Sequence, residues 1–172
     1  MLHSIVAFAI RRATDSDSED ILHCLHSAFA QFESSYTKEG FADTVLTAET
    51  LAARLTSMSL FIAVNEQGEV VGTIGCASLG NGEGHLRGMA VFPQWQGSGA
   101  AEQLLKHAEA ELRDLGCRRV TLDTTAPLKR AMRFYERHGY KPSGKVTDFY
   151  GMPLYEYAKE LQTGGASRHR LA

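Results

Sequence analysis

The sequence of 172 residues has few cysteines, no excess of positive charge and no long apolar run. Cys24, Cys76 and Cys117 are odd in number and widely separated in apolar surroundings, so we expect reduced core residues of a cytoplasmic protein. The net charge of −2 gives no electrostatic case for nucleic acid as a partner. No segment approaches the roughly 20 apolar residues that cross a bilayer, so no membrane partner is expected either.

Metal-binding and targeting patterns are also missing. His23, Cys24 and His26 lie close together, but neighbouring positions of a helix fan outward and no further ligands cluster there, so no metal site is predicted. The apolar run at residues 5–10 precedes two arginines, which is the wrong order for a secretion signal and indicates a first strand.

Alternating helix and strand signals predict a single α/β (α+β) domain over residues 1–162, followed by a small, polar and disordered tail at 163–172. Strands are expected at residues 5–13, 60–65, 69–79, in a segment ending at residue 91, at 118–123, and on both sides of 148–151. Helices are expected at residues 15–30, 48–56 and 100–115, and from Pro127 to His138. Residues 31–47 are expected to be irregular.

A glycine-containing turn joins the strand ending at Val91 to the longest predicted helix. Gly97 and Gly99 have no side chains, so a ligand can approach the backbone N–H groups closely. Those groups and the positive end of the helix dipole form a site for an anion such as a pyrophosphate. An ordinary glycine turn before a helix is the alternative. The apolar face of that helix consists of Ala100, Ala101, Leu104, Leu105, Ala108, Leu112 and Leu115.

The residues around this turn restrict the class of phosphate-bearing ligand that it could bind. No Lys-Ser or Lys-Thr pair follows either glycine, as a P-loop requires, and Glu102 stands where a dinucleotide fingerprint needs glycine or alanine. The order Val91-Phe92-Pro93 and then Gln96-Gly97-Ser98-Gly99-Ala100-Ala101 resembles the acyl-CoA loop of the GNAT N-acetyltransferase superfamily.

The resemblance covers residues 5–161 and implies a mixed central sheet, splayed around the acyl-CoA site, with helices on both faces. It implies acetyl-CoA as co-substrate, bound at its pantetheine arm by Met89, Ala90 and Val91. It also implies that the pyrophosphate is bound by Gln96, Gly97, Ser98, Gly99, Ala100 and Ala101.

A second segment, Ala131 to Tyr140, is similar to another recurrent motif of this superfamily. Tyr135 lies on the apolar face of its helix, and the resemblance implies that it protonates the departing thiolate, a task that suits a phenol. A packed tyrosine with a satisfied hydroxyl is the alternative. Leu128 departs from the motif, because many members of the superfamily have asparagine there.

The proton of the amine substrate needs an acceptor. Glu83 and His85 lie two residues apart and therefore on one face of a strand. His85 stands where members of the superfamily often have a glutamate of the base or water chain, and Glu83 is the second candidate. A surface imidazole and an exposed carboxylate are equally consistent with the pattern.

The acceptor is expected to be a primary amine of a small molecule or a peptide. In this superfamily the region after the first helix, with the loop near residues 148–151, walls the acceptor pocket. Here that region contains aromatic and acidic residues suited to a cationic amine: Phe32, Glu33, Tyr36, Phe41 and Asp43. A non-catalytic acyl-CoA-binding module and a nucleotide-binding protein are the alternative functions. Superfamily members often self-associate, which allows a homodimer.

Overall fold

The computed structural model describes residues 6–162, so the predicted tail at 163–172 lies outside the described residues. Its strands are β1 Ala9–Arg12, β2 Ser59–Val64, β3 Val70–Gly80, β4 Glu83–Val91, β5 Arg119–Thr124, β6 Lys141–Phe149 and β7 Met152–Glu160. Its α-helices are α1 Ser18–Phe29, α2 Lys38–Val45, α3 Ala48–Ser57, α4 Ala100–Asp114 and α5 Lys129–Arg137. Short 3₁₀ segments are η1 Asp15–Asp17, η2 Ala30–Ser35 and η3 Pro93–Trp95.

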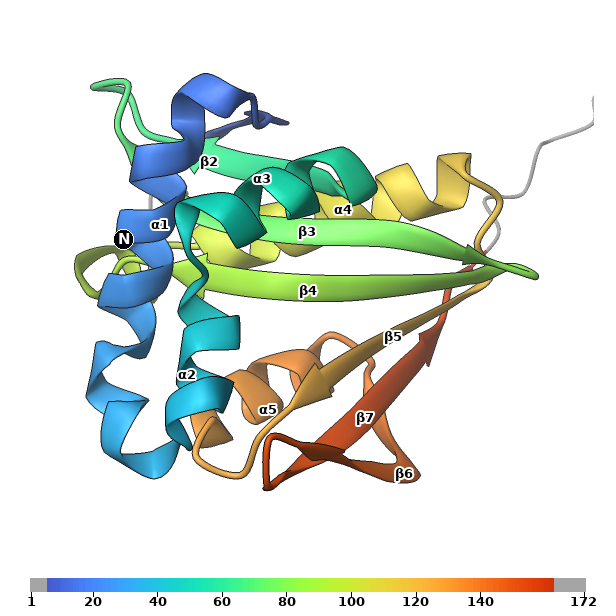
Figure 1. The fold of residues 1–172 in the computed structure, drawn as a ribbon. Helices are drawn as coiled ribbons and strands as arrows, with labels where there is room; N and C mark the ends of the chain where they lie inside the picture. Colours follow the sequence, from blue (N-terminus) through green and yellow to red (C-terminus); the bar gives the residue numbers. More distant parts are fainter. Residues whose placement is uncertain (1–5, 163–172) are drawn as a thin grey trace, which may run out of the picture.

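The strands form one seven-stranded sheet in the order β1-β2-β3-β4-β5-β7-β6. The pairing is antiparallel except between β4 and β5, which run parallel. That parallel ladder starts at the Glu83–Arg119 pair and ends at the Leu86–Leu122 pair. Beyond it the two strands diverge, as Figure 1 shows, which confirms the predicted splay of the sheet.

A bulge in β4 lies where the splay begins. Thr73 of β3 pairs with Ala90 and Gly75 pairs with Arg87, so β4 has an extra residue opposite β3. Gly88 in this bulge has φ +66°, a conformation that glycine adopts without strain. The bulge therefore turns the backbone of β4 locally at the edge of the gap.

Helices cover both faces of the sheet, as predicted. In Figure 1, α1, α2 and α3 lie on the near side and α4 lies behind. The near core includes Ile21 and Leu51, and the far core contains Leu104, Leu112 and Tyr135. Every cysteine of the described part is buried. Within residues 6–162 no helix is both long and apolar enough to cross a membrane.

Three expectations need correction. Residues 31–47 are not irregular, because they contain η2 and the short helix α2; Gly40 and only one large apolar residue, Phe41, are buried in α2, so its periodicity is weak. Leu115 is not part of the buried face of α4, since the helix ends at Asp114 and leaves its side chain 52% exposed. Pro127 precedes the helix it was expected to open, because α5 begins at Lys129.

The entry to α1 depends on an ion pair, which gives a stability prediction. Two guanidinium nitrogens of Arg11 donate to the carboxylate of Asp17 at 2.8 Å each, and the Thr14 N–H donates to it at 2.8 Å. The hydrogen bond from Arg11 is the main reason that the pKa of Asp17 falls to about 2. Asp17→Asn is expected to lower the free energy of unfolding at pH 7 by about 1–2 kcal/mol.

Because the folded pKa is depressed, this stabilisation is present above about pH 4 and disappears as the pH falls through about 2. Chemical denaturation of both proteins across this range measures the difference. Asp15→Asn, at an exposed neighbouring position, is the control. An equal loss of stability at pH 2 and pH 7 would assign the effect to packing instead of charge.

Candidate active site

A cavity of about 740 Å³ lies in the gap where β4 and β5 separate. Strand β4 contributes Met89, Ala90 and Val91 to its wall, and α5 contributes Tyr135. The structure therefore brings the two predicted motifs to one site although they are far apart in the sequence. The predicted catalytic and cofactor-binding residues that line this cavity are His85, Met89, Ala90, Val91, Gln96, Gly97, Gly99, Ala101 and Tyr135.

The glycine turn opens at one end of this cavity. Gly97 and Gly99 have φ +79° and +93°, and Cβ atoms built on them would meet no atom closer than 3.9 and 3.7 Å, respectively. Within the described residues the N–H groups of Gly97, Gly99 and Ala101 have no hydrogen-bond acceptor. The turn thus offers free N–H groups beside open space, as anion binding requires.

The side chains around these glycines hold the turn in place. The Ser98 hydroxyl donates to the Trp95 carbonyl and accepts from the Ala100 N–H at 3.4 Å. The Gln96 amide donates to the Val91 carbonyl at 3.3 Å. Neither Ser98 nor the buried Ala100 lines the cavity, so any contact of theirs with a ligand would come from the backbone.

Two positive side chains of α5 line the same cavity as the turn, and one of them contacts it. A guanidinium nitrogen of Arg130 donates to the Gln96 side chain at 3.1 Å, and both Arg130 and Arg137 line the cavity. Lys129 and Arg133 of the same helix do not. All four are basic residues of one short helix, so the sequence alone does not show which of them line the cavity. The folded structure does.

Tyr135 is almost fully buried, with a side chain packed edge-on against Tyr140 at 5.8 Å between ring centroids. Its hydroxyl makes no hydrogen bond to another described residue. Burial raises the pKa of this phenol, so it stays protonated at neutral pH. Leu128, the departure from the motif, lines the same cavity with an apolar side chain.

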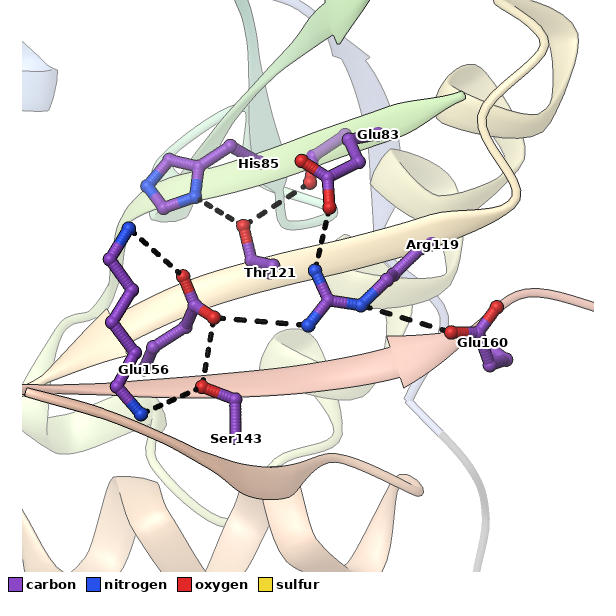
Figure 2. Close-up of polar contacts among 9 residues, drawn as sticks. Glu83, His85, Arg119, Thr121, Ser143, Glu156 and Glu160 are labelled. Carbon is purple, nitrogen blue, oxygen red and sulfur yellow. Dashed lines mark hydrogen bonds and ion pairs between the residues drawn. The ribbon is translucent and has the colours of Figure 1, made fainter. Parts of the chain in front are cut away.

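His85 lies within hydrogen-bonding or ion-pairing distance of two residues of β5 that sequence reasoning missed. Its Nδ1 is 2.9 Å from the Thr121 hydroxyl and its Nε2 is 3.5 Å from a carboxylate oxygen of Asp123. Figure 2 shows the imidazole and the Thr121 side chain directed toward each other between adjacent strands. The parallel register, with His85 opposite Thr121, causes this contact, and no short-range sequence signal reports it.

Burial is the main influence on the pKa values of His85 and Asp123. Desolvation lowers the pKa of His85 below its ordinary 6.5, although the Asp123 carboxylate partly opposes the shift. Burial likewise raises the pKa of Asp123, against the opposing effect of His85. The imidazole is therefore neutral at pH 7 and able to accept a proton.

Glu83 and His85 share one strand face, as predicted, but they have different surroundings. A carboxylate oxygen of Glu83 is 2.7 Å from the guanidinium of Arg119, which also lies 3.8 Å from Glu156 (Figure 2). Glu83 lines a second cavity of about 390 Å³, whereas His85 and Asp123 line both cavities. Of the two candidates for the catalytic base, only His85 lines the larger cavity that contains the glycine turn.

One buried polar atom in the wall has no partner. The Thr124 hydroxyl oxygen makes no hydrogen bond to any other described residue, and Thr124 lines the larger cavity at the end of β5. An unpaired hydroxyl in such a place costs stability unless a ligand or water satisfies it. The oxygen itself has almost no accessible surface, so it lies just behind the surface of the cavity.

The near side of the larger cavity is closed by the segment wrongly expected to be irregular. Phe32 and Tyr36 line it, and the Tyr36 hydroxyl is 2.7 Å from that of Thr125, just after β5. Asp43 also lines it, but its carboxylate pairs with Arg87 at 3.0 Å. The predicted acceptor residues Glu33 and Phe41 do not line the cavity, whereas Phe149, from the predicted wall near residues 148–151, does.

No group of three or more histidine, cysteine, aspartate or glutamate side chains in the described part is arranged to hold a metal ion.

Comparison with known proteins identifies the family. The model of the acetyltransferase (GNAT) family matches residues 21–140, a stretch that runs from α1 to the end of the second motif. The chain belongs to this family.

Two curated relatives and one solved structure agree with this assignment. An aminoglycoside N(6′)-acetyltransferase type 1 of Stenotrophomonas maltophilia is 37% identical over 71 residues, 41% of this chain and 46% of the relative. The N-acetyltransferase YjgM of Escherichia coli K12 is 38% identical over 81 residues, 45% of this chain and 48% of the relative. The chain thus spans about half the length of these relatives.

The PaiA N-acetyltransferase of Thermoplasma acidophilum, solved with coenzyme A, superposes with a TM-score of 0.76 at 17% identity. The superposition covers 90% of this chain and 99% of that protein, and it shows a shared fold.

The His85–Asp123 contact gives a direct spectroscopic prediction. In the unaltered protein the imidazole of His85 is expected to titrate below pH 6.5, because burial disfavours its charged form. In Asp123→Asn the midpoint falls further, since the carboxylate that favours the imidazolium is gone. NMR titration of the imidazole resonances measures both values.

Asp114→Asn, which removes an exposed carboxylate at the end of α4, is the matched control and leaves the midpoint unchanged. A midpoint that rises in Asp123→Asn would show that this carboxylate does not act on His85.

Proposed function

We propose that the protein transfers the acetyl group of acetyl-CoA directly to a primary amine. The observation that carries this proposal is the cavity in the splay, bounded by the main chain of Met89–Val91 and by the free N–H groups at Gly97 and Gly99. The family membership and the relatives named as N-acetyltransferases support it. The buried thiols are consistent with a reducing compartment such as the cytoplasm.

The residues of this chain fit coenzyme A. The N–H groups of the glycine turn suit the pyrophosphate, and the guanidinium groups of Arg130 and Arg137 would add positive charge beside it. The pantetheine arm would lie along the wall that contains Thr124. Backbone N–H and carbonyl groups of Met89–Val91 would bind the rest of that arm, with an N–H stabilising the thioester oxygen as negative charge develops.

His85 is suited to take the proton of the incoming ammonium. We assign the proton of the neutral imidazole to Nδ1, which then donates to Thr121, while the Thr121 hydroxyl faces the Gly84 carbonyl at 3.5 Å. The free Nε2 and the Asp123 carboxylate are then two acceptors 3.5 Å apart. An ammonium beside them donates to Nε2 or to the carboxylate, and Asp123 stabilises the imidazolium that forms. Glu83 would act only indirectly, through Arg119.

The neutral amine attacks the thioester carbonyl carbon, a C–N bond forms, and the C–S bond breaks to release the CoA thiolate. Tyr135 would supply the proton that this thiolate takes up, and the second proton that the amine nitrogen loses as it becomes the amide would return to Tyr135 through solvent. A phenol holds its proton more tightly than a thiol does in water. Burial raises the pKa of Tyr135 further, so its proton would move only as negative charge develops on the sulfur beside it.

Ligand binding tests the proposed function against its alternatives. Acetyl-CoA and CoA are expected to raise the melting temperature, whereas ATP and NAD do not. A free-thiol assay with amines of several classes then measures transfer, with longer acyl-CoAs as further donors. Stabilisation by acetyl-CoA without thiol release would favour a non-catalytic binding module, and stabilisation by ATP alone would favour a nucleotide-binding protein.

Tyr135→Phe tests the proton donor. The change removes only the hydroxyl, so the packing of α5 and the affinity for acetyl-CoA are expected to remain. Turnover should fall roughly 10²- to 10⁴-fold, the range for loss of a positioned acid. Steady-state kinetics and calorimetric titration separate the two effects.

Tyr157→Phe, at a tyrosine that lines neither cavity, serves as the matched control. Normal turnover in Tyr135→Phe would remove this residue from the mechanism.

A further inference from the structure

A single arginine stands out among the charged residues of the larger cavity. Arg54, in the last turn of α3, lines this cavity and is only partly exposed. Its guanidinium makes no ion pair and no hydrogen bond to any other described residue. Burial, and then the nearby charge of Arg87, lowers its pKa to about 10, although the Asp43 carboxylate that Arg87 also uses partly opposes the shift, so Arg54 remains a cation at neutral pH. A desolvated cation without a counter-ion is unfavourable unless a ligand supplies one.

The position of Arg54 places it on the acceptor side of the sheet. One of its terminal nitrogens would lie 3.2 Å from a Cβ atom built on Gly88, in the bulge of β4. Arg54 comes from α3, on the sheet face opposite α4. The residue after His85 in β4, Leu86, packs in the core under α4. Side chains alternate along a strand, so His85 points to the opposite face, which is the face of Arg54. The glycine turn proposed for the pyrophosphate leads into α4 instead, so Arg54 is not placed for the phosphates of CoA.

The neighbouring charges leave this end of the cavity positive. Asp43, the carboxylate of α2 in the wall, is already paired with Arg87 at 3.0 Å. Asp123 is beside His85, where the amine is proposed to bind. An acceptor with ammonium groups alone would therefore meet an uncompensated cation at Arg54.

We propose that the acceptor is an amine that also carries a carboxylate, as an amino acid or a short peptide does, and that Arg54 binds this carboxylate. This inference rests on the proposed function. The amine nitrogen lies beside His85 and Asp123, and the carboxylate accepts from the guanidinium of Arg54 above the bulge. A guanidinium is the side chain best shaped for a carboxylate, because its donors match both oxygens.

The test compares amines that differ only in the acid group. Phenylalanine is paired with 2-phenylethylamine, lysine with 1,5-diaminopentane, and the dipeptide Ala-Phe with its C-terminal amide. We expect the member with the carboxylate to have a kcat/KM higher by roughly 10- to 100-fold in at least one pair. The pair that shows the preference separates a free amino acid from a peptide as the source of the carboxylate.

Arg54→Gln should bring that ratio close to one, mainly through a higher KM of the carboxylated amine. Arg54→Lys should restore part of the preference, because it keeps the charge without the paired donors. Arg118→Gln, at an exposed arginine beside Gly82 at the other end of β4, removes the same charge and should leave the ratio unchanged. The acetyl-CoA-induced rise in melting temperature reports folding and cofactor binding for each variant.

Acetylation without a preference for the acid, or a preference unaffected by Arg54→Gln, would overturn this assignment and leave the proposed function intact. Loss of the acetyl-CoA-induced rise in Arg54→Gln would place Arg54 at the cofactor and also overturn it. If no amine is acetylated, the proposed function itself fails.

Discussion

Strands β4 and β5 share a parallel ladder only from Glu83 to Leu86, and the absence of pairing beyond that point creates the site. Backbone groups that a continuous sheet would consume are left facing the gap, and they need other partners. The positive φ at Gly88 and the bulge around it turn β4 at the start of the divergence. Thr124, whose hydroxyl has no hydrogen-bond partner in the described part, is the last residue of β5 on the other side of the gap. A bound acyl-CoA would take the place of the missing strand contacts.

The two walls of the gap differ in kind. On the α4 side, the groups suited to a ligand are backbone N–H groups at Gly97 and Gly99, held by the side chains of Gln96 and Ser98. On the opposite face, the groups are side chains with distinct charges. Backbone donors suit a ligand whose phosphates never vary, whereas side chains can be exchanged to suit a particular acceptor. One fold can therefore keep its donor while its acceptor changes.

The cofactor side of the gap could be predicted from the sequence more fully than the acceptor side. The glycine turn and the Tyr135 segment were recognisable because short, contiguous motifs encode them, and the strand and helix order followed from local periodicity. The segment at residues 31–47 was misjudged because α2 buries little apolar surface of its own and forms against the rest of the domain. Thr121 and Asp123 were missed as partners of His85 because the β4–β5 register brings them together, and register between distant strands leaves no local trace.

The composition of a segment also does not show which of its charged side chains are paired after folding. Read along the chain, the acceptor region offered carboxylates and aromatic rings and suggested a site for cations. In the folded protein Asp43 is neutralised by Arg87, Glu83 is held by Arg119, and Arg54 has no counter-ion in the described part. The side chains left unpaired after folding, and not the number of each sign in a segment, determine the charge that a ligand encounters. On the α3 side of this cavity that remainder is the guanidinium of Arg54, which adds a site for an anion to the site proposed for the ammonium beside Asp123.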